Sequence, residues 1–334
     1  MVVKLNKRVK IIRAIIIILC LIIMADCSEM KAGSKKTLGT DENGNMWNYD
    51  IITKTLTFTG TKDIQENYSM DGHGPEPAWH TWRERTEHLN IEDGITGIGE
   101  GAFHGFSKLK TLVIADTVTH IDTMAFESCV NLRSIHLSQN LLNIKTGAFS
   151  SCGMQQIQLP EKIKTIGDFS GCVNLKEIQL PGNVTKMGSF MFADCIRLEK
   201  VVLPAGLTEI KESDFRNCKK LTLIEMPPSV RSVTMSAFSG SGVKNIVLPP
   251  NVQRIKKGKP IGGKVFSGGG GLVSANKKLR SIVIQSKKIK KISKGAFSGL
   301  SKSCVVKVPK SRKAQYKKML WKSGLNKKIK VTAI

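Results

Sequence analysis

The feature that most constrains this chain is a phrase of 21 to 23 residues that occurs seven times between Ile98 and Arg254. Its consensus is Ile-(three residues)-Ala-Phe-(two)-Cys-(two)-Leu-(two)-Ile-(one)-Leu-Pro. A period of this size is typical of solenoids, in which each repeat forms one coil. The repeats begin at Ile98, Ile121, Ile144, Ile166, Met187, Ile210 and Val233, and their phenylalanines are Phe103, Phe126, Phe149, Phe169, Phe192, Phe215 and Phe238.

One repeat cannot enclose its own apolar side chains. Leu132, Ile135 and Leu137 share one side of a short segment, and about seven such side chains per repeat each contribute roughly 1.5–3 kcal/mol if fully buried. Ordering the backbone costs about 1–2 kcal/mol per residue. One coil alone is therefore unstable, and neighbouring coils must complete the core. The prediction is a repeat solenoid.

Five of the eight cysteines stand three residues after the phenylalanine of successive repeats. Stacked coils would place them one above another at about 4.7–4.9 Å, but parallel side chains point the same way and suit a disulfide poorly. Ser241 takes this place in the seventh repeat, as expected for a small filler. We expect free, buried thiols at Cys129, Cys152, Cys172, Cys195 and Cys218.

The charge of the chain is divided at Glu225. All 26 acidic residues lie at or before it, whereas 26 of the 52 basic residues lie after it, so the formal net charge of +26 belongs to the C-terminal part. The chain is therefore expected to be a neutral body with a cationic end.

Residues 1–28 are predicted to be a signal peptide, because a basic start precedes an apolar run from Ala14 to Ala25 that is short for a membrane span. The segment before Cys27 is similar to a lipoprotein signal, although Asp26 fits that pattern poorly. Lipidation at Cys27, ordinary cleavage and retention as a short anchor all stay open. Contact with a membrane is expected only through this segment.

The rest of the chain divides into a spacer at residues 29–36, an N-terminal cap at 37–97, repeats at 98–308 and a basic C-terminal cap at 309–334. In the N-terminal cap, residues 46–60 alternate as in a β-hairpin, and residues 78–88 are expected to be a short helix. In the C-terminal cap, Ser311 is expected to cap a helix that runs to about Ser323.

Small deletions and one insertion interrupt the period. The fourth repeat lacks two residues before Phe169, and the third and seventh lack one before Met154 and Val243. We expect these deletions to tighten turns without disturbing the strand ladder. Residues 256–276 are glycine-rich and are predicted to be an insertion in the eighth coil.

These units resemble the repeat of the BspA-like leucine-rich repeat family of bacterial and protist surface proteins. The resemblance lies in Ile98 to Phe103, Cys129 to Ile135 and the recurring Leu-Pro pairs, and it spans about Gly39 to Val331. It implies a right-handed leucine-rich-repeat coil with a parallel β-sheet, an aromatic N-terminal cap and a short helical C-terminal cap. It also implies a secreted or cell-surface protein, some relatives being implicated in adhesion to host matrix proteins or in co-aggregation, and it brings no catalytic residues.

Side chains between the buried positions of each strand are expected to point outward and form columns across the coils. Such an extended, moderately basic face suits a protein ligand, which the resemblance suggests is host matrix or cell surface; it lacks the aromatic rings that glycan sites use. A merely solvated face is the alternative. The candidate partner-binding residues are Lys110, Arg133, His136, Lys176, Lys244 and Arg280.

The cationic end suits an anionic envelope polymer, with generic solubility as the alternative. Specific nucleic-acid binding is not expected, because the only aromatics among these lysines, Tyr316 and Trp321, are interpreted as residues of the cap. The candidate contacts are Lys287, Lys288, Lys290, Lys291, Lys317 and Lys318.

No enzyme, metal or cofactor is predicted. Gly258 to Val265 has the spacing of a phosphate loop, but Val265 replaces the hydroxyl residue that such loops need. The histidines match no zinc spacing. The two function classes carried forward are an exported binding protein and a structural envelope component tethered by its basic end.

Overall fold

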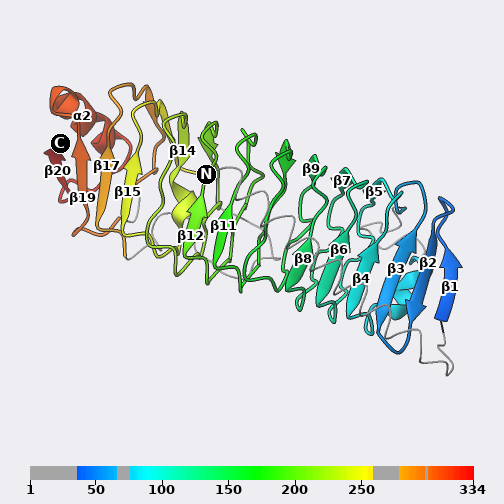
Figure 1. Ribbon diagram of the computed structural model, residues 1–334. Coiled ribbons are helices and arrows are strands. Elements are labelled where there is room, and N and C mark those ends of the chain that lie inside the picture. The colour runs from blue at the N-terminus through cyan, green and yellow to red at the C-terminus, as the bar shows by residue number, and fades with distance from the viewer. Residues whose placement is uncertain (1–35, 66–75, 259–277, 298–299) are drawn as a thin grey trace, which may run out of the picture.

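The computed structural model describes residues 36–65, 76–258, 278–297 and 300–334. These residues form an elongated parallel β-solenoid of about ten coils with one short α-helix at its C-terminal end (Figure 1). The predicted repeat solenoid is therefore confirmed. Coils 1 to 7 are numbered here by the seven repeats, and each has three sides.

The first side carries the longer strands and is called the strand face. Its neighbouring strands pair in parallel from β3 onward, so that Leu56, Leu89 and Leu112 lie in one buried row. Its strands are β1 (Lys36–Thr40), β2 (Met46–Asp50), β3 (Thr55–Thr59), β4 (His88–Ile91), β6 (Thr111–Ile114), β8 (Ser134–His136), β11 (Glu177–Gln179), β12 (Lys200–Val202), β15 (Asn245–Leu248), β17 (Ser281–Ile284), β19 (Val305–Val308) and β20 (Lys330–Ala333).

The second side is a pair of narrower parallel ladders, in the orders β10-β9-β7-β5 and β13-β14-β16-β18. One buried aliphatic residue per coil, such as Ile121 or Ile210, points into the core from this side. Its strands are β5 (Gly97–Ile98), β7 (His120–Ile121), β9 (Asn143–Ile144), β10 (Thr165–Ile166), β13 (Glu209–Ile210), β14 (Ser232–Thr234), β16 (Arg254–Lys256) and β18 (Lys291–Ile292).

The third side consists of turns that hold the phenylalanines. The rings stack along the solenoid, with centroids 5.4 Å apart between Phe103 and Phe126 and interplanar angles of 6–25° along the row. The residue two positions after each phenylalanine has a positive φ, for example 62° at Ser128 and 57° at Asn217. Glycine, asparagine, aspartate and serine at this position suit that left-handed turn better than β-branched residues would.

The cysteines line the core beside this phenylalanine row. All five predicted ladder cysteines are buried and free. Each thiol donates a hydrogen bond to the carbonyl of the phenylalanine in the preceding coil, as from Cys172 Sγ to Phe149 O at 3.1 Å. The thiol adds a hydrogen bond between coils to a carbonyl that in most coils also accepts one within its own turn, as Phe126 O does from Cys129 N at 3.3 Å.

We expect these thiols to be inert in the folded protein. Burial raises the pKa of the Cys172 thiol to about 12 and that of Cys304 to about 11, and the thiolate is the reactive form. With Cys20 and Cys27 replaced by serine, a thiol reagent at pH 8 should label less than one cysteine per folded chain and all six after denaturation. Fast labelling of the folded chain would contradict this packing.

The N-terminal end is closed by an antiparallel hairpin and aromatic rings. β2 pairs with β3 as predicted, and β1 adds a further antiparallel strand that the sequence analysis did not foresee. Tyr49 stacks on Trp82 at 4.2 Å, and Trp79 donates from Nε1 to Ala102 O at 2.9 Å. The helix expected at residues 78–88 is only a 3-10 turn over Ala78–Trp82, because β4 already begins at His88.

The C-terminal end is closed by α2 (Lys313–Lys322), which follows a 3-10 turn at Lys310–Arg312. Tyr316 and Leu320 of this helix are buried against the last coils. The expected cap at Ser311 is wrong: the 3-10 turn places Arg312 at the N-cap, without a side-chain cap bond. A further 3-10 turn lies at Met235–Phe238 in coil 7.

Candidate binding surfaces

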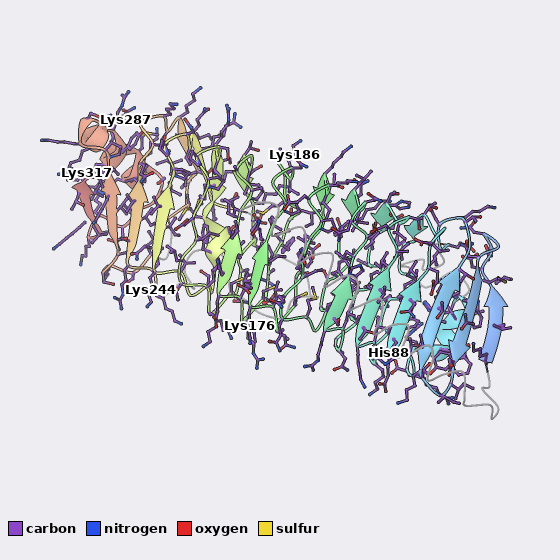
Figure 2. All side chains as sticks on the ribbon, in the orientation of Figure 1. His88, Lys176, Lys186, Lys244, Lys287 and Lys317 are labelled. Carbon is purple, nitrogen blue, oxygen red and sulfur yellow. The ribbon has the colours of Figure 1, made fainter. Side chains whose placement is uncertain are left out.

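The six predicted partner-binding residues are all exposed on the strand face. All but His136 stand directly before the first residue of a strand. Their backbones are linked from coil to coil, as by Arg133 N to Lys110 O at 3.0 Å and Arg280 N to Lys244 O at 2.7 Å. Lys176 and Lys244 project from the same long edge of the solenoid as His88 (Figure 2).

A carboxylate neutralises the basic residue nearest the N-terminal end among these positions, Lys110. Glu87 accepts from Lys54 Nζ at 2.6 Å and pairs with Lys110. These two hydrogen bonds, chiefly the one from Lys110, lower the pKa of Glu87 to about 2. His136 is the last residue of β8, on the outward-facing row nearer the end of each strand, and lies opposite Val113 in the β6–β8 pair. The face is therefore mixed rather than uniformly basic.

The strand ladder is interrupted twice, which contradicts the expectation that deletions leave it undisturbed. Residues 154–159 of coil 3 and 221–226 of coil 6 form no strand. The ladder therefore divides into β1-β2-β3-β4-β6-β8, β11-β12 and β15-β17-β19-β20. The six predicted residues are spread over these three segments. The first holds Lys110, Arg133 and His136, the central one holds Lys176, and the last holds Lys244 and Arg280.

Glycine packing accompanies each one-residue deletion. Gly153 N donates to Cys129 O at 3.3 Å, and Gly242 N donates to Cys218 O at 2.9 Å. A Cβ at Gly153 would lie 2.3 Å from Val130 O, and one at Gly242 would lie 2.4 Å from Lys219 O. The shortened turn thus lies close against the preceding coil. In coil 3 the segment after Gly153 forms no strand, whereas in coil 7 β15 follows Gly242 intact and the missing strand is that of coil 6.

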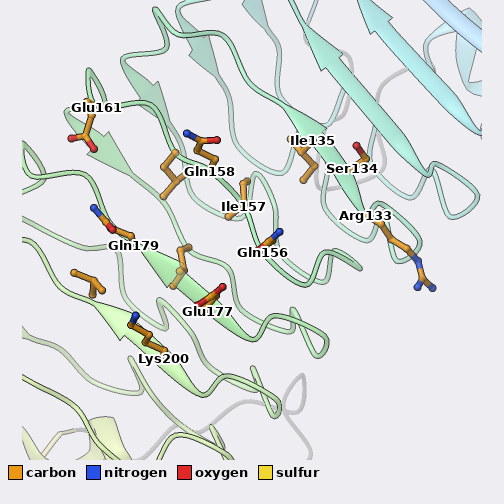
Figure 3. A pocket seen from close by; sticks show the side chains of 13 residues that line it. Arg133, Ser134, Ile135, Gln156, Ile157, Gln158, Glu161, Glu177, Gln179 and Lys200 are labelled. Atoms are coloured by element: carbon orange, nitrogen blue, oxygen red, sulfur yellow. The ribbon is translucent and has the colours of Figure 1, made fainter. Parts of the chain in front are cut away.

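The broken ladder leaves backbone groups open. Among the described residues, 156–159 make no backbone hydrogen bond to either neighbouring coil, although Lys176 N still donates to Gln155 O at 2.8 Å. Figure 3 shows Gln156, Ile157 and Gln158 on this loop between β8 and β11. Peptide groups without a ladder partner are satisfied by water and can serve a ligand instead.

Two hollows open at these interruptions. One, of about 650 Å³, extends from Arg133 in coil 2 to Lys200 and Val202 in coil 5. The other, of about 610 Å³, extends from Lys200 and Val202 to Pro228 in coil 6. Because they share Lys200 and Val202, they form one depression, which we call the central groove. The groove was not predicted from the sequence, although the one-residue deletions at Cys-Gly-Met and Ser-Gly-Val lie in or next to the coils that lack a strand.

The predicted anion-binding lysines gather at the C-terminal end. Lys287, Lys288, Lys290 and Lys291 flank Ile289, whose N–H donates to Tyr316 Oη of α2 at 3.1 Å. This bond joins their segment to the helix that carries Lys317 and Lys318. Lys287 projects from the edge opposite Lys176, and Lys317 from the end itself (Figure 2).

The cations of this end lack acidic neighbours. Within residues 279–297 and 300–334, the structure shows no ion pair. Lys288 Nζ instead donates to Asn251 Oδ1 at 2.7 Å, and Lys317 Nζ lies 4.8 Å from the ring centroid of Trp321. In coils 1 to 6, by contrast, Lys110, Lys145 and Arg216 pair with a carboxylate of the preceding coil.

The comparisons with known proteins agree with this geometry. The BspA type leucine-rich repeat region matches in six copies, over residues 82–168, 143–259 and 272–333. The chain belongs to the BspA-type leucine-rich repeat family. The comparison with curated proteins finds no match.

Solved structures of leucine-rich repeat proteins share the fold of this BspA-type chain. One from Bacteroides ovatus has 24% identity and a TM-score of 0.60, covering 91% of this chain and 78% of its own. One from Eubacterium ventriosum has 18% identity and a TM-score of 0.53, covering 82% and 84%. At this identity the likeness concerns the fold alone.

Several predicted features lie outside the described residues, namely the signal peptide with Cys27 and the insertion from residue 259 onward. In the described part of the chain, no group of three or more His, Cys, Asp or Glu side chains could hold a metal ion. No described helix is long and apolar enough to cross a membrane.

Proposed function

We propose that this BspA-type protein is an exported, non-enzymatic binding protein that holds a protein ligand on its strand face. The observation that carries the proposal is the extended outer face of a solenoid whose core residues are occupied in stacking the coils. Arg133, Lys176, Lys244 and Arg280 are exposed on that face. Extended repeat surfaces of this kind suit protein partners, and the family resemblance favours a partner on a host matrix or cell surface.

The test compares two variants with the same change in charge. Replacing Arg133, Lys176, Lys244 and Arg280 with alanine removes cations from the strand face, whereas the control replaces Lys164, Lys186, Arg231 and Arg254, which are exposed elsewhere on the coils. Binding to immobilised fibronectin is measured by surface plasmon resonance at several salt concentrations. We expect the strand-face variant to bind at least tenfold more weakly and the control to bind nearly normally.

Equal binding by both variants would exclude the strand face as the contact. If the unchanged protein does not bind fibronectin at physiological salt, adhesion to this matrix protein is refuted. A parallel measurement on isolated bacterial wall then decides for the second candidate below.

A second candidate function has its own observation. The absence of acidic side chains among the described residues 279–297 and 300–334 leaves the cations of this end available to an external polyanion. We propose that this end contacts an anionic envelope polymer, either as a tether for the binding protein or, in the alternative class, as the anchor of a structural envelope component. Long-range attraction of this kind weakens as salt is added.

A further inference from the structure

The central groove carries negative charge in a chain of net charge +26. Its rim holds the exposed carboxylates of Glu161, Glu177, Glu199 and Glu225. Within the described residues none of these four forms an ion pair, whereas Glu87, Asp122, Asp194 and Glu209 elsewhere on the solenoid do.

The cations of the groove do not cancel these carboxylates. Arg133 and Lys200 are the basic residues of its lining. Lys200 lies directly opposite Glu177 in the β11–β12 pair, so this pair is balanced. Of the other charged residues in the lining, Glu161, Glu199 and Glu225 outnumber Arg133, so the lining has a net charge of −2. Lys176 lies just outside the lining, where Glu199 N donates to Lys176 O at 2.8 Å.

Apolar side chains form part of the floor of the groove, chiefly in the second hollow. Ile135, Val201 and Leu203 occupy core positions but are only partly buried here, while the corresponding Ile178 and Leu180 of β11 and its following turn are 3% and 2% exposed. Val202 and Leu223 are 41% and 58% exposed at the junction and in the second hollow. Exposed apolar surface rimmed by polar groups is a common sign of an interaction site.

We infer that the central groove binds an extended peptide segment of a partner protein in which basic and apolar side chains alternate. The apolar side chains would lie on the floor, and the basic ones would reach the glutamates of the rim. The inference rests on the proposed binding role of the strand face and names the chemistry of the partner.

The dimensions fit such a segment. The groove crosses coils 2 to 6, and neighbouring coils are about 4.8 Å apart, so its length is roughly 20 Å. An extended chain rises about 3.3 Å per residue, which gives about six residues. The carboxylates oppose a polyanion, and the lining contains no aromatic side chain on which a sugar could stack.

The test uses the full chain and three synthetic octapeptides, with calorimetry at low and physiological salt. One peptide alternates leucine and lysine, one leucine and glutamate, and one serine and lysine. We expect the leucine–lysine peptide to bind at least tenfold more tightly than either of the others, since it alone matches both the floor and the rim.

Two variants locate the binding site. In the first, Glu161, Glu199 and Glu225 become glutamine, which should weaken the leucine–lysine peptide about tenfold at low salt and remove most of its salt dependence. Its matched control changes Glu92→Gln, Asp93→Asn and Glu100→Gln, which lie outside the groove. In the second, Gln179→Trp fills the first hollow from an exposed strand position and should weaken the peptide by a similar factor.

Equal affinity for the leucine–lysine and leucine–glutamate peptides overturns the inference, as does an unchanged affinity in both groove variants or no binding at all. The proposed binding role of the strand face can be contradicted independently of the inference about the groove. A further variant with only Lys244→Ala and Arg280→Ala leaves the groove lining unchanged. If it binds fibronectin more weakly while the groove variants bind it normally, the strand face keeps its role and the groove is rejected.

Discussion

Replacing six lysines of the cationic end with glutamine is expected to weaken binding to a sulfated polysaccharide such as heparin by at least a hundredfold at low salt. An exposed basic residue near an anionic surface contributes about 1 kcal/mol, and no acidic side chain in the described C-terminal residues offsets these charges. Glutamine keeps the polarity of the side chain while removing its charge. The variant changes Lys287, Lys288, Lys290, Lys291, Lys317 and Lys318.

The measurement is a heparin-binding isotherm at a series of salt concentrations. The slope of log affinity against log salt should become flatter, because fewer counterions are exchanged on binding. A matched control replaces six exposed lysines that lie before Glu225, outside the cationic end, which should change the slope much less. These are Lys62, Lys108, Lys164, Lys186, Lys219 and Lys220. Equal weakening in the two variants would mean that total charge, and not the end of the solenoid, determines the contact.

The outline of the fold could be predicted from the sequence because the pattern of core residues is local to each repeat and recurs along the chain. Each coil uses the same positions for its core, so the period of Phe103, Phe126 and Phe149 predicts both the coil and the ring stack. The cysteine positions followed from the same argument. Alternation along each strand also predicted which side chains would be exposed, including Lys176 and Lys244.

The central groove could not be predicted in the same way. A one-residue deletion can shorten only the turn, or it can also change the register of the next strand. Which of the two happens depends on how closely neighbouring turns approach. In coil 3 the close approach of Gly153 to Val130 O shows that the turn did not absorb the deletion. The ring stack is also wider around Phe169, whose repeat lacks two residues: the Phe149–Phe169 and Phe169–Phe192 centroids are 6.4 and 6.2 Å apart.

The end caps show a related limit. β1 pairs with β2 through backbone hydrogen bonds, and its side chains alternate only between exposed and partly buried, so its hydrophobic pattern is weak. The start of α2 is set by the 3-10 turn after Pro309 rather than by the hydroxyl of Ser311. Both features depend on contacts that a single segment does not specify.

The substitution Asp214→Asn is expected to stabilise the protein at pH 8 and to leave its stability near pH 4 almost unchanged. Asp214 precedes Phe215 at the position where Ala102, Ala125 and Ala148 precede theirs, and it is fully buried. Its Oδ2 accepts from Lys211 N at 2.6 Å, whereas Oδ1 has no partner with good hydrogen-bond geometry among the described residues. The backbone groups of Lys211 and Met191 nearby lower its pKa, but less than burial raises it. Burial raises the pKa of this carboxyl to about 7.

The sign of the pH dependence follows from this shift. In the unfolded chain the carboxyl loses its proton near its ordinary pKa of about 3.9, whereas the folded protein keeps the proton up to about pH 7. The stability associated with Asp214 is therefore complete below about pH 4, falls as the pH rises, and is lost above about pH 7. The rise of this pKa from about 3.9 to about 7 corresponds to about 4 kcal/mol, which the neutral amide of asparagine should largely restore at pH 8.

Asp168 provides the matched control, because it also directly precedes a phenylalanine of the row, Phe169. Its carboxylate accepts from Gly147 N at 3.0 Å and from Ser150 Oγ at 2.7 Å, and Ser170 donates to it as well. Asp168→Asn replaces an acceptor with a donor among these groups and should destabilise the fold by about 1–3 kcal/mol. Urea unfolding between pH 4 and pH 8 measures both variants.

Opposite effects at pH 8 would show that the environment of each carboxyl, and not its place in the repeat, determines its contribution to stability. If Asp214→Asn instead destabilises the protein at pH 8 as Asp168→Asn does, the Asp214 carboxylate must have partners that compensate its burial. A parallel pH profile in the unchanged protein and the Asp214 variant would likewise mean that this group does not titrate between pH 4 and pH 7 on folding.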